Sequence, residues 1–324
     1  MKALQAPFPW YGGKSRAAGL VWERFGDVRN YVEPFFGSGA VLLNRPTPAK
    51  IETVNDIDGF IANFWRSVAL SPAETARWAD SPVNEADLHA RHVWLVNQRE
   101  EFTARIMGDP EYHDPKVAGW WVWGISCWIG HGWCSGEGPW NIDEVGRLCR
   151  NVDGVGISKK IPMISQVFKG VHKIGISKQI PMISQVFKGV NQTGQGSIAD
   201  WFSDLRTRLR GVRVACGDWA RVMADSGIQQ NGFPVGVFLD PPYEDFEHAY
   251  TNTDSVAAQV REWAIANGDC AGVRIALCGY DGEHAMPDGW ECVAWKSKGK
   301  SENAARERIW FSPHCLRANQ GVLL

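Results

Sequence analysis

The sequence predicts an α/β fold in which a mostly parallel sheet carries helices on both faces and ends in an antiparallel hairpin. Two observations lead to this prediction. Short runs rich in β-branched residues alternate with stretches of helical periodicity, which is the pattern of a parallel sheet. The last two runs, 291–295 and 308–311, leave no room for a crossover helix between them, so they should pair antiparallel at one edge.

Each expected strand is a short run that is rich in β-branched or aromatic residues. The expected strands are 30–33, 51–54, 212–216, 235–239, 273–277, 291–295 and 308–311. The expected helices are 14–25, 40–44, 59–69, 198–210 and 254–267. Asp58 stands directly before the third helix, where an aspartate side chain can accept hydrogen bonds from the first free amides.

A stretch in the middle of the chain, residues 71–196, breaks this alternation. We therefore expect a smaller inserted domain at 71–196 and a larger domain assembled from 1–70 and 197–324. The inserted stretch begins with an acidic, His-containing helical region and continues into a segment with several Trp residues. The Trp residues between 120 and 140 are expected to form the core of the smaller domain.

A tandem repeat follows: 156–171 and 175–190 are copies that differ only at Lys160 and Gln179. Such near identity indicates an exposed loop or hairpin that tolerates changes in length. The repeat lies within 146–213, where 12 Lys and Arg stand against 3 Asp and Glu, in a chain whose formal charge is −2. A basic segment in an otherwise acidic protein favours a polyanionic partner. The repeat itself is either a phosphate-facing arm or a neutral surface insertion.

The composition, 44% hydrophobic and 22% charged over 324 residues, is that of a globular protein. Eight Cys occur without a Cys-x-x-Cys pair or zinc-like spacing, so we expect buried free thiols and no metal. Residues 117–135 are uncharged, but four Gly, a His and five Trp interrupt any aliphatic run, which argues against a membrane span. The N-terminus has no signal-like apolar stretch, and the expected location is cytoplasmic.

The strand at 235–239 runs directly into Asp240-Pro241-Pro242-Tyr243. The two prolines prevent continuation as helix or sheet, which leaves a stiff turn where open α/β sheets bind their ligands. The turn offers a carboxylate, proline carbonyls without local amide partners, and an aromatic face. This set suits a planar group that carries an exocyclic amine, and adenine is such a group.

Three other expected strand tips also carry a carboxylate, namely Glu33, Asp56 and Asp218. The turn after Glu33 contains Gly37 and Gly39, which allow close approach of the backbone to a ligand at the start of a helix. Asp56 can bond ribose hydroxyls, and Asp218 can accept an adenine amine beside the Trp that follows it. Four acidic tips at one edge, without a G-x-G-x-x-G or P-loop lysine, favour a cationic nucleoside, S-adenosylmethionine.

These motifs together resemble the D12 class of DNA N6-adenine methyltransferases, the family of DNA adenine methylase. The resemblance includes the segments 8–14, 33–39, 55–58, 240–243 and 307–313, which stand in the order of the family. It implies a Rossmann-like methyltransferase sheet, S-adenosylmethionine as cofactor and double-stranded DNA as substrate. It also implies a DNA target-recognition domain in the middle of the chain and a setting typical of restriction–modification systems.

The resemblance further implies roles for single residues. Trp10 and Lys14 would contact the methionine end of the cofactor, Lys14 through the cofactor carboxylate. The remaining cofactor contacts would come from Glu33, Phe35, Gly37, Gly39, Asp56 and Asp218. A flipped-out adenine would meet a carboxylate and a carbonyl that accept its two amino hydrogens, beside a ring that stacks on it. The catalytic set is Asp240, Pro241, Pro242 and Tyr243.

Lysines are the expected contacts to DNA phosphates. Lys159, Lys160 and Lys178 lie in the repeat, and Lys298 and Lys300 lie in the loop between the last two expected strands. That loop has an alternative interpretation as an exposed hairpin connection.

Two other functions stay open from the sequence. One is methyl transfer to RNA adenine or to a protein glutamine amide, although Asp240 and the large middle region favour DNA. The other is an inactive DNA-binding relative, against which the complete series of acidic strand tips argues. The oligomeric state, monomer or dimer, is also open.

Overall fold

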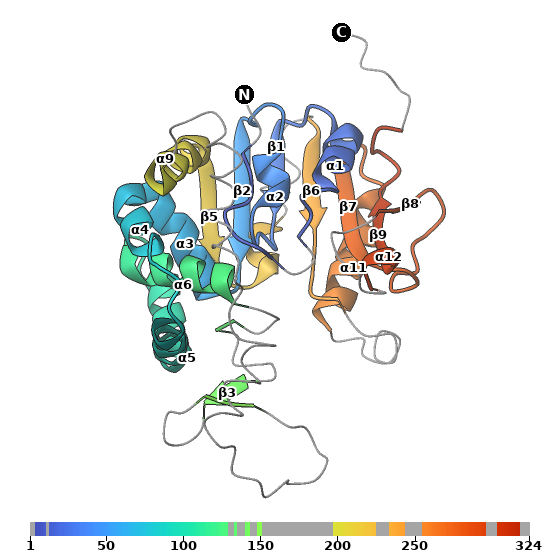
Figure 1. Ribbon diagram of the computed structural model, residues 1–324. Coiled ribbons are helices and arrows are strands. Elements are labelled where there is room, and N and C mark those ends of the chain that lie inside the picture. Colours follow the sequence, from blue (N-terminus) through green and yellow to red (C-terminus); the bar gives the residue numbers. More distant parts are fainter. Residues whose placement is uncertain are drawn as a thin grey trace, which may run out of the picture. The chain divides into compact units, whose positions relative to one another are not determined.

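Seven strands form one sheet in the computed structural model, which describes residues 4–10, 13–128, 133–134, 140–142, 148–150, 197–224, 233–243, 255–295 and 303–317. From edge to edge the strands are β5 (Val212–Cys216), β2 (Ile51–Asp56), β1 (Asn30–Glu33), β6 (Val235–Leu239), β7 (Val273–Tyr280), β9 (Glu307–Phe311) and β8 (Glu291–Ala294) (Figure 1). The first five strands are parallel. β9 is antiparallel to both β7 and β8, which confirms the expected antiparallel edge.

The chain divides into two compact units. The sheet unit consists of Met1–Ala6, Gly12–Ile57 and Arg208–Leu324, and the helical unit consists of Pro7–Tyr11 and Asp58–Thr207. These bounds come from internal packing and do not test which residues recognise DNA. The assignment of 71–196 to a recognition domain therefore stays a prediction.

Helices cover both faces of the sheet. On one face, β6 presents Gly236, where an added Cβ would lie 2.9 Å from the ring of Phe25 at the end of α1 (Ala18–Phe25). On the other face, the apolar side chains of β6 and β7 share a buried cluster with Val260 and Ala264 of α11 (Val256–Gly268). The alternation of side chains along a strand thus separates the two helical layers. The sheet unit also contains α2 (Ala40–Leu43), the 3-10 turn η2 (Trp219–Val222) and α12 (Asn303–Arg306).

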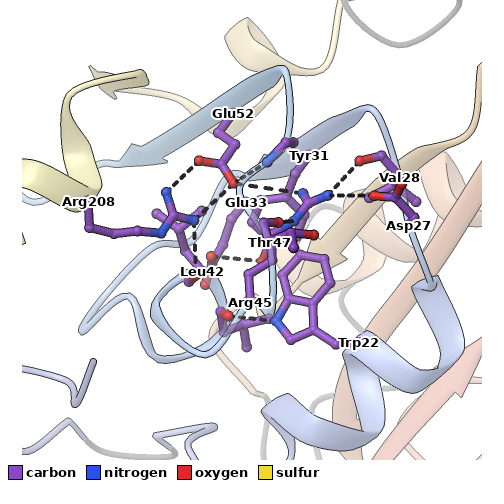
Figure 2. Close-up of polar contacts among 12 residues, drawn as sticks. Trp22, Asp27, Val28, Tyr31, Glu33, Leu42, Arg45, Thr47, Glu52 and Arg208 are labelled. Carbon is purple, nitrogen blue, oxygen red and sulfur yellow. Dashed lines mark hydrogen bonds and ion pairs between the residues drawn. The ribbon is translucent and has the colours of Figure 1, made fainter. Parts of the chain in front are cut away.

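A group of buried charges joins the early and late segments of the sheet unit. Glu52, near the start of β2, accepts hydrogen bonds from both terminal nitrogens of the Arg208 guanidinium, at 2.6 and 2.9 Å. The Arg45 guanidinium lies 3.7 Å from the same carboxylate and stacks on the ring of Trp22 (Figure 2). Arg208 also donates to the carbonyl of Leu42. The group of charges therefore fixes β2 to the segment that leads into β5.

The helical unit is built from α3 (Gly59–Leu70), α4 (Pro72–Ala79), α5 (Glu85–Gly108), α6 (Pro115–Cys127), most of α9 (Ile198–Leu209), and the antiparallel pair β3 (Trp140–Ile142) and β4 (Leu148–Arg150). Asp58 accepts a hydrogen bond from the Phe60 amide and caps α3, as predicted. Trp121 and Trp123 of α6 are fully buried, which confirms that Trp side chains contribute to the core of this part of the chain. No described helix is both long and apolar enough to cross a membrane.

Two differences from the predicted elements matter for the site. The helix expected at 14–25 begins only at Ala18, because residues 15–17 form a turn in which the Lys14 carbonyl accepts hydrogen bonds from Ala17 and Ala18. β7 continues three residues beyond its expected end, to Tyr280, and this extension pairs with Glu307 at the start of β9. The first difference concerns the segment that carries Lys14 and the second the strand that pairs with Glu307, and both of these charged side chains lie at the strand tips.

Candidate active site

The acidic strand tips converge as predicted. β5, β2, β1 and β6 are parallel neighbours, so their carboxyl ends lie along one edge of the sheet. Glu33 ends β1 and Asp56 ends β2, whereas Asp218 and Asp240 follow β5 and β6. The edge between β1 and β6, where the strand order reverses direction, is where doubly wound sheets bind their ligands.

The Asp240 carboxylate is held through one of its two oxygens. The Lys14 ammonium lies 2.9 Å from Oδ1, and the Tyr243 hydroxyl donates a hydrogen bond of 2.9 Å to the same atom. Within the described residues, every polar contact of this carboxylate falls on Oδ1. The side chain is 19% exposed. The second oxygen, Oδ2, therefore stays available as an acceptor for an incoming group.

Lys14 is a buried cation, 3% exposed, beside two carboxylates. Its ammonium lies 2.9 Å from Asp240 and 3.8 Å from Glu307, and it also stands 5.0 Å from the centre of the Tyr243 ring. Burial favours the neutral amine, but the nearby acidic groups outweigh it and the pKa of Lys14 is raised. Lys14 is therefore charged at neutral pH and neutralises part of the acidic cluster. Its predicted contact with the cofactor carboxylate stays a prediction.

Glu307 completes this cluster, and the sequence analysis assigned it no role. Its Oε2 lies 3.1 Å from the Tyr243 hydroxyl, whose single hydrogen is shared between Glu307 and Asp240. Burial raises the pKa of the Glu307 carboxyl, the Lys14 ammonium opposes this, and the Asp240 charge adds to it. The available signal was an acid directly before the expected strand 308–311, at the start of the segment 307–313. Its meaning depended on the register of β9 with β7.

Aromatic and thiol groups surround the cluster. The rings of Tyr243 and Tyr280 meet edge to face with centroids 4.7 Å apart. Burial, followed by the nearby Asp240 charge, raises the pKa of the Tyr243 hydroxyl well above its usual value, so the hydroxyl keeps its proton. Burial raises the pKa of the Cys278 thiol in the same way. A neutral buried thiol is a poor nucleophile, and the arrangement does not depend on a covalent enzyme intermediate.

The glycine turn lies between β1 and α2 and is tied to the neighbouring strand tips. Gly37 and Gly39 have φ values of 46° and 66°, which side-chain-bearing residues rarely adopt. The Gly37 amide donates a hydrogen bond of 2.9 Å to Asp56 Oδ2. Asn55 Nδ2 donates to the carbonyls of Pro34 and Gly217, at 3.1 and 2.9 Å. Asn55, which the sequence analysis gave no role, thus connects the loops that follow β1 and β5.

Glu33 is buried, 2% exposed, at the end of β1. Its Oε2 accepts a hydrogen bond of 2.8 Å from the Tyr31 hydroxyl, and its carboxyl lies in the group drawn in Figure 2. Burial raises the pKa of Glu33 well above its ordinary value, against the effect of the hydrogen bond from Tyr31. Its predicted part in the methionine pocket stays a prediction.

The ring of Trp219, which follows the predicted adenine-binding residue Asp218, contacts another aromatic ring. The rings of Phe35 and Trp219 stack with centroids 6.2 Å apart and an interplanar angle of 29°. Trp219 is 8% exposed and packs with the apolar core of the sheet, so most of its ring is already covered. Asp218 is exposed, and its Oδ1 accepts a hydrogen bond from the Ala220 amide at the start of η2. Its carboxylate thus begins a turn in this structure.

The remaining predicted site residues belong to the helical unit or lie outside the described residues. Trp10 belongs to the helical unit, is 38% exposed and packs edge to face on Phe8. The predicted DNA contacts lie outside the described residues; they are Lys159, Lys160, Lys178, Lys298 and Lys300. In the described part of the chain, no group of three or more His, Cys, Asp or Glu is arranged to hold a metal ion.

The strand order and the acidic edge define an α/β protein whose fold is consistent with that of a methyltransferase. In a comparison with protein families, the model of the D12 class of N6 adenine-specific DNA methyltransferases matches residues 10–108. No curated protein matches the chain. The family match confirms the resemblance on which the sequence prediction depended, and it supports an enzyme that methylates adenine N6 in DNA. The match includes Lys14, the glycine turn and Asp56, and it ends before Asp240.

Proposed function

We propose that this protein transfers a methyl group from S-adenosylmethionine to N6 of an adenine flipped out of duplex DNA. The observation that carries the proposal is the asymmetry of the Asp240 carboxylate. Oδ1 is occupied by Lys14 and Tyr243, whereas Oδ2 is available for a hydrogen bond from an amino group. A substrate that is DNA also agrees with the expected cytoplasmic location.

The residues at the strand tips fit S-adenosylmethionine. Gly37 and Gly39 have positive φ values, which favour glycine, and they carry no side chain that would obstruct the approach of the cofactor to the backbone. Asn55 Oδ1 is buried and has no hydrogen-bond partner within the described residues, so a ligand donor could satisfy it. Asp56 and Asp218 add two carboxylates that suit ribose hydroxyls and an adenine amine. When bound, the cofactor supplies an electrophilic methyl group carried by a sulfonium.

The protein's part in the reaction is to orient a weak nucleophile. The lone pair of adenine N6 is delocalised into the ring, so the amine must be drawn out of conjugation. Asp240 Oδ2 and the Pro241 carbonyl would accept the two amino hydrogens and direct the lone pair toward the methyl group. The neutral amine is too weak an acid to lose a proton before attack, so Asp240, whose Oδ1 is paired with Lys14, accepts a hydrogen bond from it. Once the new N–C bond has formed, the positively charged N6 gives up one proton, for which the hydrogen-bonded Asp240 Oδ2 is the acceptor.

The target base must first leave the duplex. Flipping costs a few kcal/mol, and stacking on an aromatic side chain returns about 1–3 kcal/mol. Tyr243 and the exposed Pro242 are the candidates for contacts with the base, since both follow Asp240 in the same turn. The lysines of the repeat and of the loop after β8 would contribute phosphate contacts, whose strength falls as salt rises.

Replacement of Asp240 tests the proposal directly. We expect Asp240→Ala to abolish transfer of tritium-labelled methyl groups to adenine in duplex DNA, because the amine loses its carboxylate acceptor. DNA affinity, measured by fluorescence anisotropy, should stay within about twofold, since the phosphate contacts lie elsewhere.

Asp281→Asn is the matched control. Asp281 is an exposed carboxylate just beyond β7 that pairs with Arg308 at 2.7 Å and does not contact Lys14 or Tyr243. This variant should methylate at the wild-type rate. Unchanged methylation by Asp240→Ala, or transfer to RNA or to a glutamine peptide in preference to DNA, would contradict the proposal.

A further inference from the structure

Glu307 contacts the same two groups that hold Asp240. Its Oε2 lies 3.1 Å from the Tyr243 hydroxyl and 3.8 Å from the Lys14 ammonium, and both of these groups also contact Asp240 Oδ1. Lys14 and Tyr243 are thus two donors that each contact both carboxylates. One carboxylate faces the proposed substrate, whereas the other is 3% exposed and belongs to β9.

The sheet holds Glu307 rigidly. β9 pairs with β7 on one side and with β8 on the other, and Tyr280 is the residue of β7 opposite Glu307. The ring of Tyr280 packs against Tyr243, so one strand pair supports both the carboxylate and the ring. A side chain on a strand with a neighbour on each side is held more firmly than one on a loop, because its backbone is fixed on two sides.

We propose that Glu307 is a positioning residue for methyl transfer, which anchors Lys14 and Tyr243 on Asp240 Oδ1 and thereby keeps Oδ2 directed at the adenine amine. This inference rests on the proposed function. Glu307 has no contact with substrate in this scheme and acts only through the other three side chains.

The physical reason is the balance of charge around one buried cation. With both carboxylates ionised, the Lys14 ammonium is shared, and neither carboxylate is fully neutralised. Without the Glu307 charge, Lys14 would pair more strongly with Asp240 and could bridge both of its oxygens. The second acceptor of the Tyr243 hydroxyl would at the same time become a weaker, uncharged one. Asp240 would then be a weaker and less well oriented acceptor, because charge interactions are strong in a buried cluster.

Glu307→Gln tests the inference, because it keeps the size of the side chain and removes its charge. We expect the single-turnover rate of methyl transfer to fall roughly ten- to a hundredfold, as a slight misplacement of a reacting group does. The dissociation constants for S-adenosylmethionine and for duplex DNA should stay within about twofold. A loss confined to substrate binding would overturn the positioning role.

Glu52→Gln is the matched control. Glu52 is also 3% exposed and also pairs with a buried cation, but it lies near the start of β2 and contacts Arg208. This variant should lose thermal stability and keep the wild-type single-turnover rate per folded molecule. Equal slowing by Glu307→Gln and Glu52→Gln would show a general effect of buried charge and refute the inference.

A double-mutant cycle with Tyr243→Phe separates coupling from independent effects. If Glu307 acts through Tyr243 and Lys14, then Glu307→Gln should slow the Tyr243→Phe enzyme by much less than it slows wild type. Fully additive effects on the rate would contradict the inference. Should Glu307→Gln fail to fold, Glu307→Asp provides the test: it keeps the charge with a shorter reach and should retain a measurable part of the rate, again with unchanged substrate affinities.

The outcomes distinguish this inference from the proposed function. Absence of adenine methylation by the wild-type protein would remove both. Wild-type activity that depends on Asp240, together with a full rate in Glu307→Gln, would remove only the role of Glu307.

Discussion

At the scale of single residues, the buried titratable groups divide into two kinds. Lys14 and Glu307 have charged partners in the acidic cluster. His284, by contrast, is buried beside Trp310 and interacts with a backbone carbonyl, that of Cys278, at 3.1 Å. Burial outweighs that hydrogen bond and lowers the pKa of His284 from 6.5 to about 4. The imidazole is therefore neutral at neutral pH, and in the folded protein it resists taking up a proton as the pH falls.

The sign of the resulting pH dependence follows from linkage. The unfolded chain binds a proton at His284 near pH 6.5, whereas the folded protein resists protonation down to about pH 4. Stability from this group is therefore present above pH 6.5 and is lost as pH falls from 6.5 toward 4. Glu307 and Glu33, whose carboxyl pKa values are raised, contribute with the opposite sign. The comparison of a variant with wild type isolates the histidine.

We expect His284→Gln to reduce the loss of stability between pH 7 and pH 4.5, because a glutamine donates to the Cys278 carbonyl without titrating. Urea unfolding at the two pH values, followed by tryptophan fluorescence, measures this difference. An identical decrease in both proteins would mean that His284 does not contribute to the acid sensitivity.

At the scale of elements, a helix can pack closely on a strand where the facing strand residue has no side chain. Gly236 in β6 lets α1 reach the sheet: an added Cβ would lie 2.9 Å from Phe25 Cδ2 and 3.1 Å from Val28 Cγ2. Gly272, directly before β7, has open surroundings, with its nearest such contact at 3.9 Å. The two glycines therefore form a natural pair for comparison.

Gly236→Ala should lower the free energy of unfolding by about 1–3 kcal/mol, the usual effect of overpacking a core. Gly272→Ala should change it by less than about 0.5 kcal/mol, as most surface substitutions do. Thermal unfolding monitored by circular dichroism measures both. A smaller loss at Gly236 than at Gly272 would show that α1 can shift to accept the methyl group.

At the scale of the whole molecule, the sheet is assembled from two distant parts of the chain. β1 and β2 come from the first 57 residues, whereas β5 to β9 follow Arg208. The Arg208–Glu52 pair joins these parts, and both side chains are less than a tenth exposed. Removing one partner of such a pair leaves an uncompensated buried charge.

Arg208→Met should therefore cost about 3–5 kcal/mol of stability. The double variant Arg208→Met with Glu52→Gln should lose clearly less than the sum of the two single variants, because it leaves no buried Glu52 carboxylate without Arg208. Urea denaturation curves of the four proteins give these values. Strict additivity would show that the two side chains act independently.

Much of the sheet could be predicted from local pattern. The strands at 30–33, 212–216 and 235–239 have the bounds that the sequence analysis expected, because apolar β-branched runs with polar ends are a local signal. The convergence of Glu33, Asp56, Asp218 and Asp240 also followed, since parallel strands place their carboxyl ends together. The family motifs were recognisable for the same reason, as each one is a continuous segment. The D12 family model matches residues 10–108, which include most of segment 8–14 and all of 33–39 and 55–58.

The contacts within the site depended on tertiary structure. The sequence alone determined that an acid and two prolines end a central strand and that glycines follow another. It did not determine that Lys14 and Glu307, 293 positions apart, share Tyr243 and Asp240. That arrangement arises from the register of β9 against β7 and from the turn that precedes α1. The physical reason is that the charges of a buried ion cluster must be balanced in space, whereas their spacing along the chain is arbitrary.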